Sequence, residues 1–368
     1  MSLKELLNFL ESQVPPAYQE PYDNSGMQVG DPDAAVSSVL LSLDVTGDVI
    51  DEAASLGCEL IISHHPLIFK PLKSICGRTA AEKLVMKAIR KNIAVYSMHT
   101  NLDIINGGVS YRMAKMLGLT NINVLSPLDN KLLKLVVFVP GSHAGQLRNA
   151  IFDAGAGYIG NYDRCSYNVH GEGTYRPGAG TDPYSGEQGE DHTEAEIRIE
   201  TVVPEHLKSR VVKAMMAAHP YEEVAYDIYK IENAVPGAGL GCVGDAGEGM
   251  DDVDFIKLLS EVFGAKGIRH TALENKKIKR VAVMGGSGGA YIAKAVSSGA
   301  DAFVTGDIKY HDFLEAEGIL LADIGHYESE KPAMEILHEI ITKKFPKFAV
   351  RFSEKNTNPV NYLQAWKK

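Results

Sequence analysis

The strongest constraint in this sequence is an alternation of short apolar runs with amphipathic runs that end at glycine. In the first half, SSVLLSLDV and CELIISHH flank TGDVIDEAASLG, which is expected to form a helix that ends at Gly57. Apolar runs without polar alternation are typical of strands that a parallel sheet buries on both faces. The chain is therefore expected to fold as an α/β protein.

A similar order of elements returns near the C-terminus. The run KKIKRVAVMGG is predicted to be a strand, GGAYIAKAVSSG a helix that ends at Gly299, and ADAFVTGD the next strand. The halves match best in their last motifs, because HTNLD and HYESE each place a histidine four residues before a carboxylate. We interpret residues 1–127 and 235–368 as two pseudo-repeated α/β lobes that form one core.

The segment between these halves, residues 128–234, follows a different pattern. KLLKLVVFVP, TEAEIRIETVV and VAYDIYKIEN are predicted to be strands, and SHAGQLRNAIFDAG and PEHLKSRVVKAMMAAH are predicted to be helices. This gives roughly the β-α-β-β-α-β order of a ferredoxin-like α+β domain. A compact unit is tolerated as an insertion when its ends lie close together, so we expect an inserted domain. Residues 157–190, rich in Gly and Tyr, are interpreted as a mobile loop.

Length, charge and cysteine content limit the classes of function. A chain of 368 residues has room for two or three domains. The net charge of −10 disfavours nucleic acid and anionic membranes as partners, because binding to phosphates relies on basic surfaces. The four cysteines form no C-x-x-C pair, the N-terminal amphipathic helix does not resemble a signal peptide, and no run approaches the ~20 apolar residues of a membrane span. The cytoplasm is the expected compartment.

Two adjacent histidines, His64 and His65, end the apolar run CELIISHH and precede Pro66. Ligands of α/β sheets collect beyond the carboxyl ends of strands. Neighbouring residues of an extended strand point to opposite sides, so the pair can share a site only if the chain turns there, which Pro66 favours. Neutral imidazole suits Zn, Fe, Mn, Co or Ni. A metal site is one interpretation, and a polar end of a strand is the other.

Two further strand ends carry a histidine and a carboxylate four residues apart, a spacing that places both on one face of a helix. Two ions about 3.5–4 Å apart usually need bridging carboxylates and several histidines. Each motif alone is also explained as a polar cap of its element. Taken together, the three strand ends predict a two-metal site, with His99 facing the substrate or supporting a ligand. The predicted ligands are His64, His65, Asp103, His326 and Glu330.

Three other motifs carry weaker signals. In GDIKYHD, Asp307 or His311 either orients a metal ligand or acts as an acid or base, or Asp307 simply caps a helix. The GGSGG run between a strand and a helix resembles a phosphate-binding turn, although a tight turn with close packing is the preferred interpretation. The HPYEE motif of residues 219–223 is either a site or the end of a helix that leads into a strand.

In these motifs the chain resembles the GTP cyclohydrolase 1 type 2 homolog family, also called the Ngg-interacting-factor-three-like family, over nearly its whole length. The matching pieces are PYDNSGMQVGD, SHHPLIFKPLKSI, MHTNLD, TGDIKYHD and DIGHYESE, and HPYEE with AYDIY resembles the insert of long members. The resemblance implies a dinuclear centre of Zn, Fe or Mn at the same five residues. It also implies a core of two similar lobes, a PII/CutA-like insert that is prone to form trimers, and a toroidal homohexamer whose metal sites face its cavity.

Two classes of function fit these observations. The first is a metal-dependent hydrolase that acts on a nucleotide or related small molecule, since an activated water can attack a purine C8, a phosphoester or an amide. The second is a non-catalytic metal-binding or regulatory protein that senses a small ligand through its PII-like insert. We favour the first, with two divalent ions per subunit; the sequence leaves the reaction and the native metal open.

Overall fold

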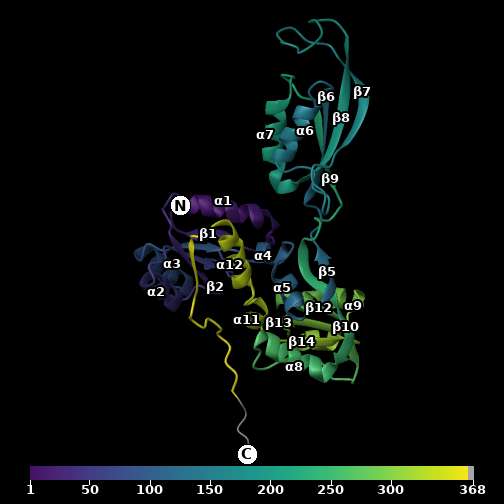
Figure 1. Ribbon diagram of the computed structural model, residues 1–368. Coiled ribbons are helices and arrows are strands. Elements are labelled where there is room, and N and C mark those ends of the chain that lie inside the picture. The colour runs from purple at the N-terminus through teal and green to yellow at the C-terminus, as the bar shows by residue number, and fades with distance from the viewer. Residues whose placement is uncertain (364–368) are drawn as a thin grey trace, which may run out of the picture. The chain divides into compact units, whose positions relative to one another are not determined.

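The computed structural model describes residues 1–363, and the chain divides into two compact units. The core unit consists of Met1–Ser126 together with the part of the chain that begins at Gly239, and the inserted unit is Pro127–Ala238. Both units combine helices with sheets, which confirms the predicted mixed α/β class (Figure 1). Within residues 1–363, no helix has both the length and the apolar character needed to cross a membrane.

The first sheet of the core unit has four parallel strands and an antiparallel edge strand, β1. Its strand order is β1-β4-β3-β2-β15, with bounds Gly26–Val29, Ala94–Ser97, Leu60–Ser63, Ser38–Ser42 and Ala349–Phe352. Leu60 and Ile62 pack into one core cluster and Ile61 into another, so β3 is buried on both faces, as its apolar run predicts.

Helices cover both faces of this sheet. The leucines of α1 pack with α12 on one face, and α2 and α3 pack on the other. Thr46 and Thr79 begin α2 and α3, because each threonine side chain accepts a hydrogen bond from a backbone N–H of the first helical turn. The bounds of these helices are Leu3–Gln13 for α1, Gly47–Ser55 for α2, Ala80–Arg90 for α3 and Ala333–Lys344 for α12.

The second sheet of the core unit contains the parallel strands β12, β13 and β14 at its centre. Its order is β11-β14-β13-β12-β10-β5, with bounds Arg269–His270, Leu320–Asp323, Ala302–Gly306, Lys277–Ser287, Gly239–Asp251 and Thr120–Pro127. Core residues of α5 and α8 pack on one face, and those of α9 on the other. The helix bounds are Val109–Met116 for α5, Asp252–Phe263 for α8, Ile292–Ser297 for α9 and Tyr310–Glu315 for α10. One apolar cluster includes residues of both sheets and thereby fixes them together.

The inserted unit is a four-stranded antiparallel sheet with two helices against one face (Figure 1). The elements follow one another in the order β6-α6-β7-β8-α7-β9, and the strand order in the sheet is β7-β8-β6-β9. This is the β-α-β-β-α-β order expected from the sequence. The bounds are Leu132–Pro140, Ala144–Asp153, Tyr167–Tyr175, His192–Pro204, Lys208–Ala218 and Tyr226–Ile231.

The structure corrects the interpretation of residues 157–190 as a single loop. Nine of these residues, Tyr167–Tyr175, form β7 and pair antiparallel with β8 from end to end. Most side chains of β7 are exposed, and two of its residues are glycines, so the strand lacks the alternation of apolar and polar residues that marks a half-buried strand. Its pairing with β8 therefore supplies the order that its own sequence does not encode.

We predict that His219 makes the inserted unit less stable in acid. Its Nε2–H donates to the carbonyl of Phe138 (2.8 Å), and its Nδ1 accepts the N–H of Tyr221 (3.1 Å). Burial lowers the pKa of His219 below 6.5, so the unfolded chain binds a proton before the folded chain does. The contribution is therefore fully present above about pH 6.5 and is lost as the pH falls below that value.

The comparison that tests this prediction is with His219→Gln, which retains a donor and an acceptor but does not titrate. Chemical unfolding at pH 7.5 and pH 5.5 is expected to show a larger loss of unfolding free energy in the wild type than in the variant. Equal losses in the two proteins would show that His219 is not responsible.

Candidate metal centre

The carboxyl ends of parallel strands from both core sheets deliver the polar side chains of this site. His64 and His65 directly follow β3, and His99 follows β4 at the start of α4 (Thr100–Ile104), which carries Asp103. In the second sheet, β14 leads into α11 (His326–Glu330), whose first and last residues are the predicted ligands. The structure thus brings together all five residues that the sequence singled out, and one ring nitrogen of His99 joins them.

His64 presents a ring nitrogen to two carboxylates. Its Nδ1 lies 2.8 Å from the carbonyl oxygen of Met98, which can only accept, so Nδ1 carries a proton. In the neutral ring, Nε2 then offers a lone pair, and it lies 3.7 Å from both Asp103 Oδ1 and Glu330 Oε1. Within the described part of the chain, His64 Nε2 and Asp103 Oδ1 are buried without any hydrogen-bond partner. Buried lone pairs that face one another fit a cation between them.

His65 and His326 converge on the other oxygen of the same glutamate. Glu330 Oε2 lies 2.7 Å from His65 Nε2 and 2.8 Å from His326 Nε2. The two Nε2 atoms are 3.2 Å apart. Two groups of three ligand atoms therefore share Glu330, one with His64 and Asp103 and the other with His65 and His326. Each group can hold a metal ion.

Each outer ring nitrogen is held by a carboxylate or a carbonyl. His65 Nδ1 lies 2.7 Å from Asp44, and His326 Nδ1 lies 2.8 Å from Asp307. Metal-binding histidines almost always have such a partner, which fixes the ring and its tautomer. Asp44 was not identified from the sequence, although it follows the strand run SSVLLS and so carries the same strand-end signal as His64.

The three substrate-facing or supporting candidates occupy different positions. His99 packs its ring 5.3 Å from that of His64, and its Nδ1 lies 2.7 Å from Asp23. Within residues 1–363, its Nε2 has no hydrogen-bond partner. Asp307 orients His326, as described above. His311 lies on α10 with its ring against Tyr310, and no potential metal group among residues 1–363 includes it. Asp23 was also missed, because it lies in a loop whose sequence gives no sign of the contact.

Burial and the charges of neighbouring side chains shift the pKa values of this cluster. Burial alone lowers the pKa of His65, but Asp44 and Glu330 outweigh it and raise the pKa to about 10. Burial likewise lowers the pKa of His326, while Glu330 and Asp307 raise it to about 9. Burial raises the pKa of Asp103 to about 7, whereas the surrounding histidines outweigh burial and hold the pKa of Glu330 well below its usual range. Protons and metal ions compete for the same nitrogen atoms.

The GGSGG run packs against the bridging carboxylate. Gly286 has a φ of 67°, and a Cβ at this position would overlap Glu330 Oε1. Its N–H donates to Ser329 Oγ at 2.9 Å, which ties the end of β12 to α11. This geometry agrees with the interpretation of the run as a tight, closely packed turn.

One side of the cluster opens into a cavity of about 580 Å³. His65 and His326 line it, together with their partners Asp44 and Asp307. His64 is fully buried and does not line it. A ligand in this cavity would therefore meet the His65 and His326 side of the cluster first.

Several known proteins are similar to this chain in sequence or fold over nearly their whole length. Residues 1–359 match the family model described as Duf34/NIF3 (NGG1p interacting factor 3). The protein named GTP cyclohydrolase 1 type 2 homolog of Halalkalibacterium halodurans is 41% identical over 364 residues, covering 97% of this chain and 98% of that protein. Its namesake in Bacillus subtilis is 38% identical, covering 98% of each chain.

Two solved structures are also similar. The Bacillus cereus protein related to NIF3 is 39% identical with a TM-score of 0.86, and Staphylococcus aureus protein SA1388 is 32% identical with a TM-score of 0.78. Each alignment covers 99% of both chains.

We predict that Gly286→Ala weakens metal binding, because the added Cβ displaces the carboxylate that both groups of ligand atoms share. Changes beside metal ligands typically reduce affinity about 10–100-fold, and a similar loss of Zn²⁺ affinity is expected here. Competition with a chelator measures it. Gly299→Ala is the matched control, since Gly299 has a φ of 75° but open space around its Cβ position. Equal affinities in the two variants would contradict the prediction.

Proposed function

This chain belongs to the Duf34/NIF3 family, and on that premise we propose that it is a dinuclear metal-dependent hydrolase acting on a nucleotide or related small molecule. The observation that carries the proposal is the position of Glu330, whose two carboxylate oxygens face two separate groups of ligand atoms. A carboxylate shared in this way is what two adjacent ions require.

We assign His64, Asp103 and Glu330 to one ion and His65, His326 and Glu330 to the other. Imidazole and carboxylate donors suit Zn, Fe or Mn. Divalent ions bound there would supply Lewis-acid polarisation and activation of water for hydrolysis. His64 Nε2 and Asp103 Oδ1 support this fit, since both atoms are buried and neither has a hydrogen-bond partner among residues 1–363.

The protein's own residues would orient the rings of this centre. Asp44 and Asp307 hold the rings of His65 and His326, as their hydrogen bonds indicate. His99 does not line the cavity that His65 and His326 line, and its Nδ1 is held by Asp23, so we assign it a supporting role beside His64. The cavity of about 580 Å³ has the size of a small-molecule site. The names of the relatives support a nucleotide as substrate.

The wider organisation is proposed from the family resemblance. We propose a toroidal homohexamer of chains with two pseudo-repeated lobes, 1–127 and 235–368, and a PII/CutA-like insert at 128–234. The three central parallel strands in each core sheet support the two lobes, and the β-α-β-β-α-β order supports the insert. The hexamer rests on the family resemblance alone. A cytoplasmic location is supported by the four cysteines, which are all unpaired.

A second candidate function is non-catalytic. In this version the chain binds metal as a regulatory protein and senses a small ligand through the insert. It is favoured by a cavity of about 630 Å³ within the inserted unit, lined by no residue of the metal cluster.

Metal stoichiometry tests the shared carboxylate. We predict two ions per wild-type chain, loss of one in His64→Asn or in His326→Asn, and loss of both in Glu330→Gln. Mass spectrometry of the metals in equilibrated protein provides the count. Glu328→Gln is the control, because Glu328 is a buried acid of the same helix that accepts from Asn358 and should leave both ions bound. Retention of one tightly bound ion in Glu330→Gln would contradict the bridging role.

Turnover separates the two functions. Metal-loaded protein is expected to hydrolyse at least one compound in a panel of nucleotides and phosphoesters, and Asp103→Ala should abolish that activity. Asp307→Asn should reduce turnover about 10–100-fold by releasing the ring of His326. His311→Asn is the control with unchanged turnover, since His311 lies outside the cluster. If the only rates observed survive removal of His65 and Glu330, the hydrolase proposal fails and the regulatory one gains support.

A further inference from the structure

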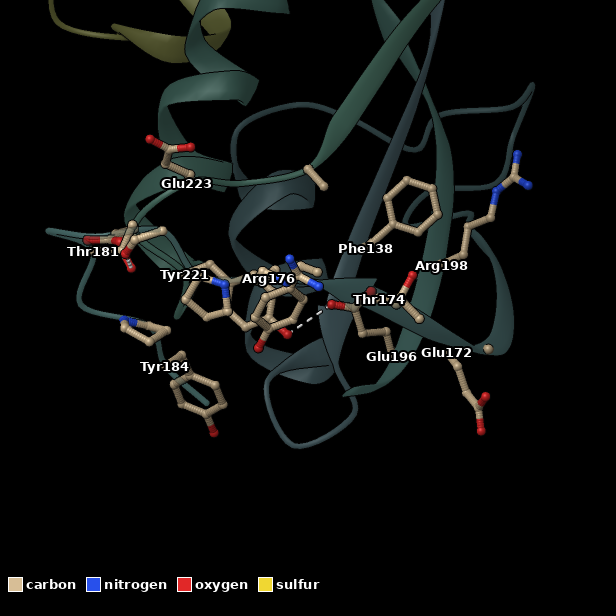
Figure 2. Close-up of a pocket in the computed structure, with 18 of the residues that line it drawn as sticks. Phe138, Glu172, Thr174, Arg176, Thr181, Tyr184, Glu196, Arg198, Tyr221 and Glu223 are labelled. Carbon is tan, nitrogen blue, oxygen red and sulfur yellow. Dashed lines mark hydrogen bonds between the residues drawn. The ribbon is translucent and has the colours of Figure 1, made fainter. Parts of the chain in front are cut away.

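The inserted unit contains a cavity of about 630 Å³ (Figure 2). It lies on the face of the sheet opposite the helices: alternate residues of β6 and β8, such as Val137 and Ile199, belong to the apolar core beneath the helices, whereas Phe138 and Arg198 line the cavity. The loop after β7 and the HPYEE motif complete its wall. A cavity of this volume fits a small molecule.

Aromatic rings form one part of the wall. Tyr221, from the HPYEE motif, lies with its ring centroid 6.1 Å from that of Tyr175 and 5.8 Å from that of Tyr184. Tyr175 ends β7. Tyr184 belongs to the loop that follows β7 (Figure 2). Phe138 adds a fourth ring from β6. Aromatic rings that line a cavity attract a cation over an open face, because each ring is negative over its face.

Acidic side chains form another part of the wall. Four glutamates line the cavity, against two arginines. Both arginines are paired with acids that do not line it, since Arg176 binds Asp191 at 2.7 Å and Arg198 binds Glu200 at 2.9 Å. Among the described residues, none of the glutamates forms an ion pair; the four are Glu172, Glu196, Glu222 and Glu223. The wall therefore carries negative charge that the protein leaves unneutralised.

Glu196 is the most constrained of these acids. It is only 9% exposed, and its Oε1 accepts the hydroxyl of Tyr221 at 2.9 Å (Figure 2). On the neighbouring strand, Gly173 provides the space for the carboxylate, because a Cβ at that position would overlap Glu196 Oε2. Within residues 1–363, Oε2 has no hydrogen-bond partner. A buried carboxylate with one free oxygen beside an aromatic wall is a strong acceptor for a charged N–H group.

We propose that this cavity binds a small organic cation, one that carries a protonated amine or a guanidinium group on an apolar body. The charged group would lie against Glu196 Oε2, and the apolar body would pack on the rings of Tyr175, Tyr184 and Tyr221. Anions such as nucleotides are disfavoured by the same four glutamates. The site shares no residue with the metal cluster, so this inference stands independently of the hydrolase proposal.

A matched set of probes tests the charge preference on the full-length chain. Phenethylammonium, 2-phenylethanol and phenylacetate have similar size and differ in charge, and calorimetry and NMR titration measure their binding. Saturable binding is expected for phenethylammonium, with at least about tenfold weaker binding for the neutral and anionic probes. Stronger binding of phenylacetate or of ATP would overturn the proposal, and so would the absence of saturable binding at millimolar concentration.

Variants locate the binding site. Glu196→Gln and Tyr221→Leu are each expected to weaken phenethylammonium binding about tenfold, through loss of the charged acceptor and of the central ring respectively. Glu205→Gln is the control, because Glu205 is an acid of the same unit that does not line the cavity. Circular dichroism confirms that each variant is folded, and two independent variants guard against misfolding of one. Unchanged affinity in both, or a crystal structure in which a second copy of the chain fills the cavity, would overturn the proposal.

Discussion

The candidate metal centre of this protein depends on one buried carboxylate, Glu330, that is shared between two groups of potential ligand atoms. Burial of Glu330 is unfavourable for its charge, yet the ring nitrogens of His64, His65 and His326 surround it and hold its pKa low. Asp103 is a second buried acid in the same space, and its pKa is raised to about 7. Two acids held together in this way favour a site that contains cations.

The architecture around Glu330 explains how such a site is built. Parallel strands end at a common edge, so β2, β3 and β4 place Asp44, His64 and His99 near one another, while β13 and β14 deliver Asp307 and His326. The apolar cluster that includes residues of both sheets packs the two sheets against each other. Gly286 has no side chain, and a Cβ at this position would overlap Glu330. The packing of the two sheets and the close approach of Gly286 to Glu330 therefore set the positions of the potential metal ligands.

The cavity beside the metal cluster and the cavity of the inserted unit have different chemistry. The cavity beside the metal cluster is lined by histidines that a cation would organise, whereas the cavity of the inserted unit is lined by glutamates and tyrosines. In the first, bound divalent ions would make the environment attractive to anionic or polar groups. In the second, the unneutralised acids favour a cation directly.

The sequence by itself determined the three central parallel strands of each core sheet and the five clustered side chains, because continuous apolar runs specify buried strands and polar residues at their carboxyl ends stand out against them. The sequence did not predict strand β7, since an exposed strand with two glycines has no apolar pattern of its own. The sequence did not identify Asp23 either, because the contact of Asp23 with His99 joins a loop to a strand end 76 residues away. Only the tertiary structure decided that Glu330 is shared, that Asp307 rather than His311 orients a ring, and that Glu196 and Tyr221 meet at one cavity. Spacing along a chain fixes which side chains share a face of one element, whereas packing between elements fixes which atoms of different elements come within bonding distance.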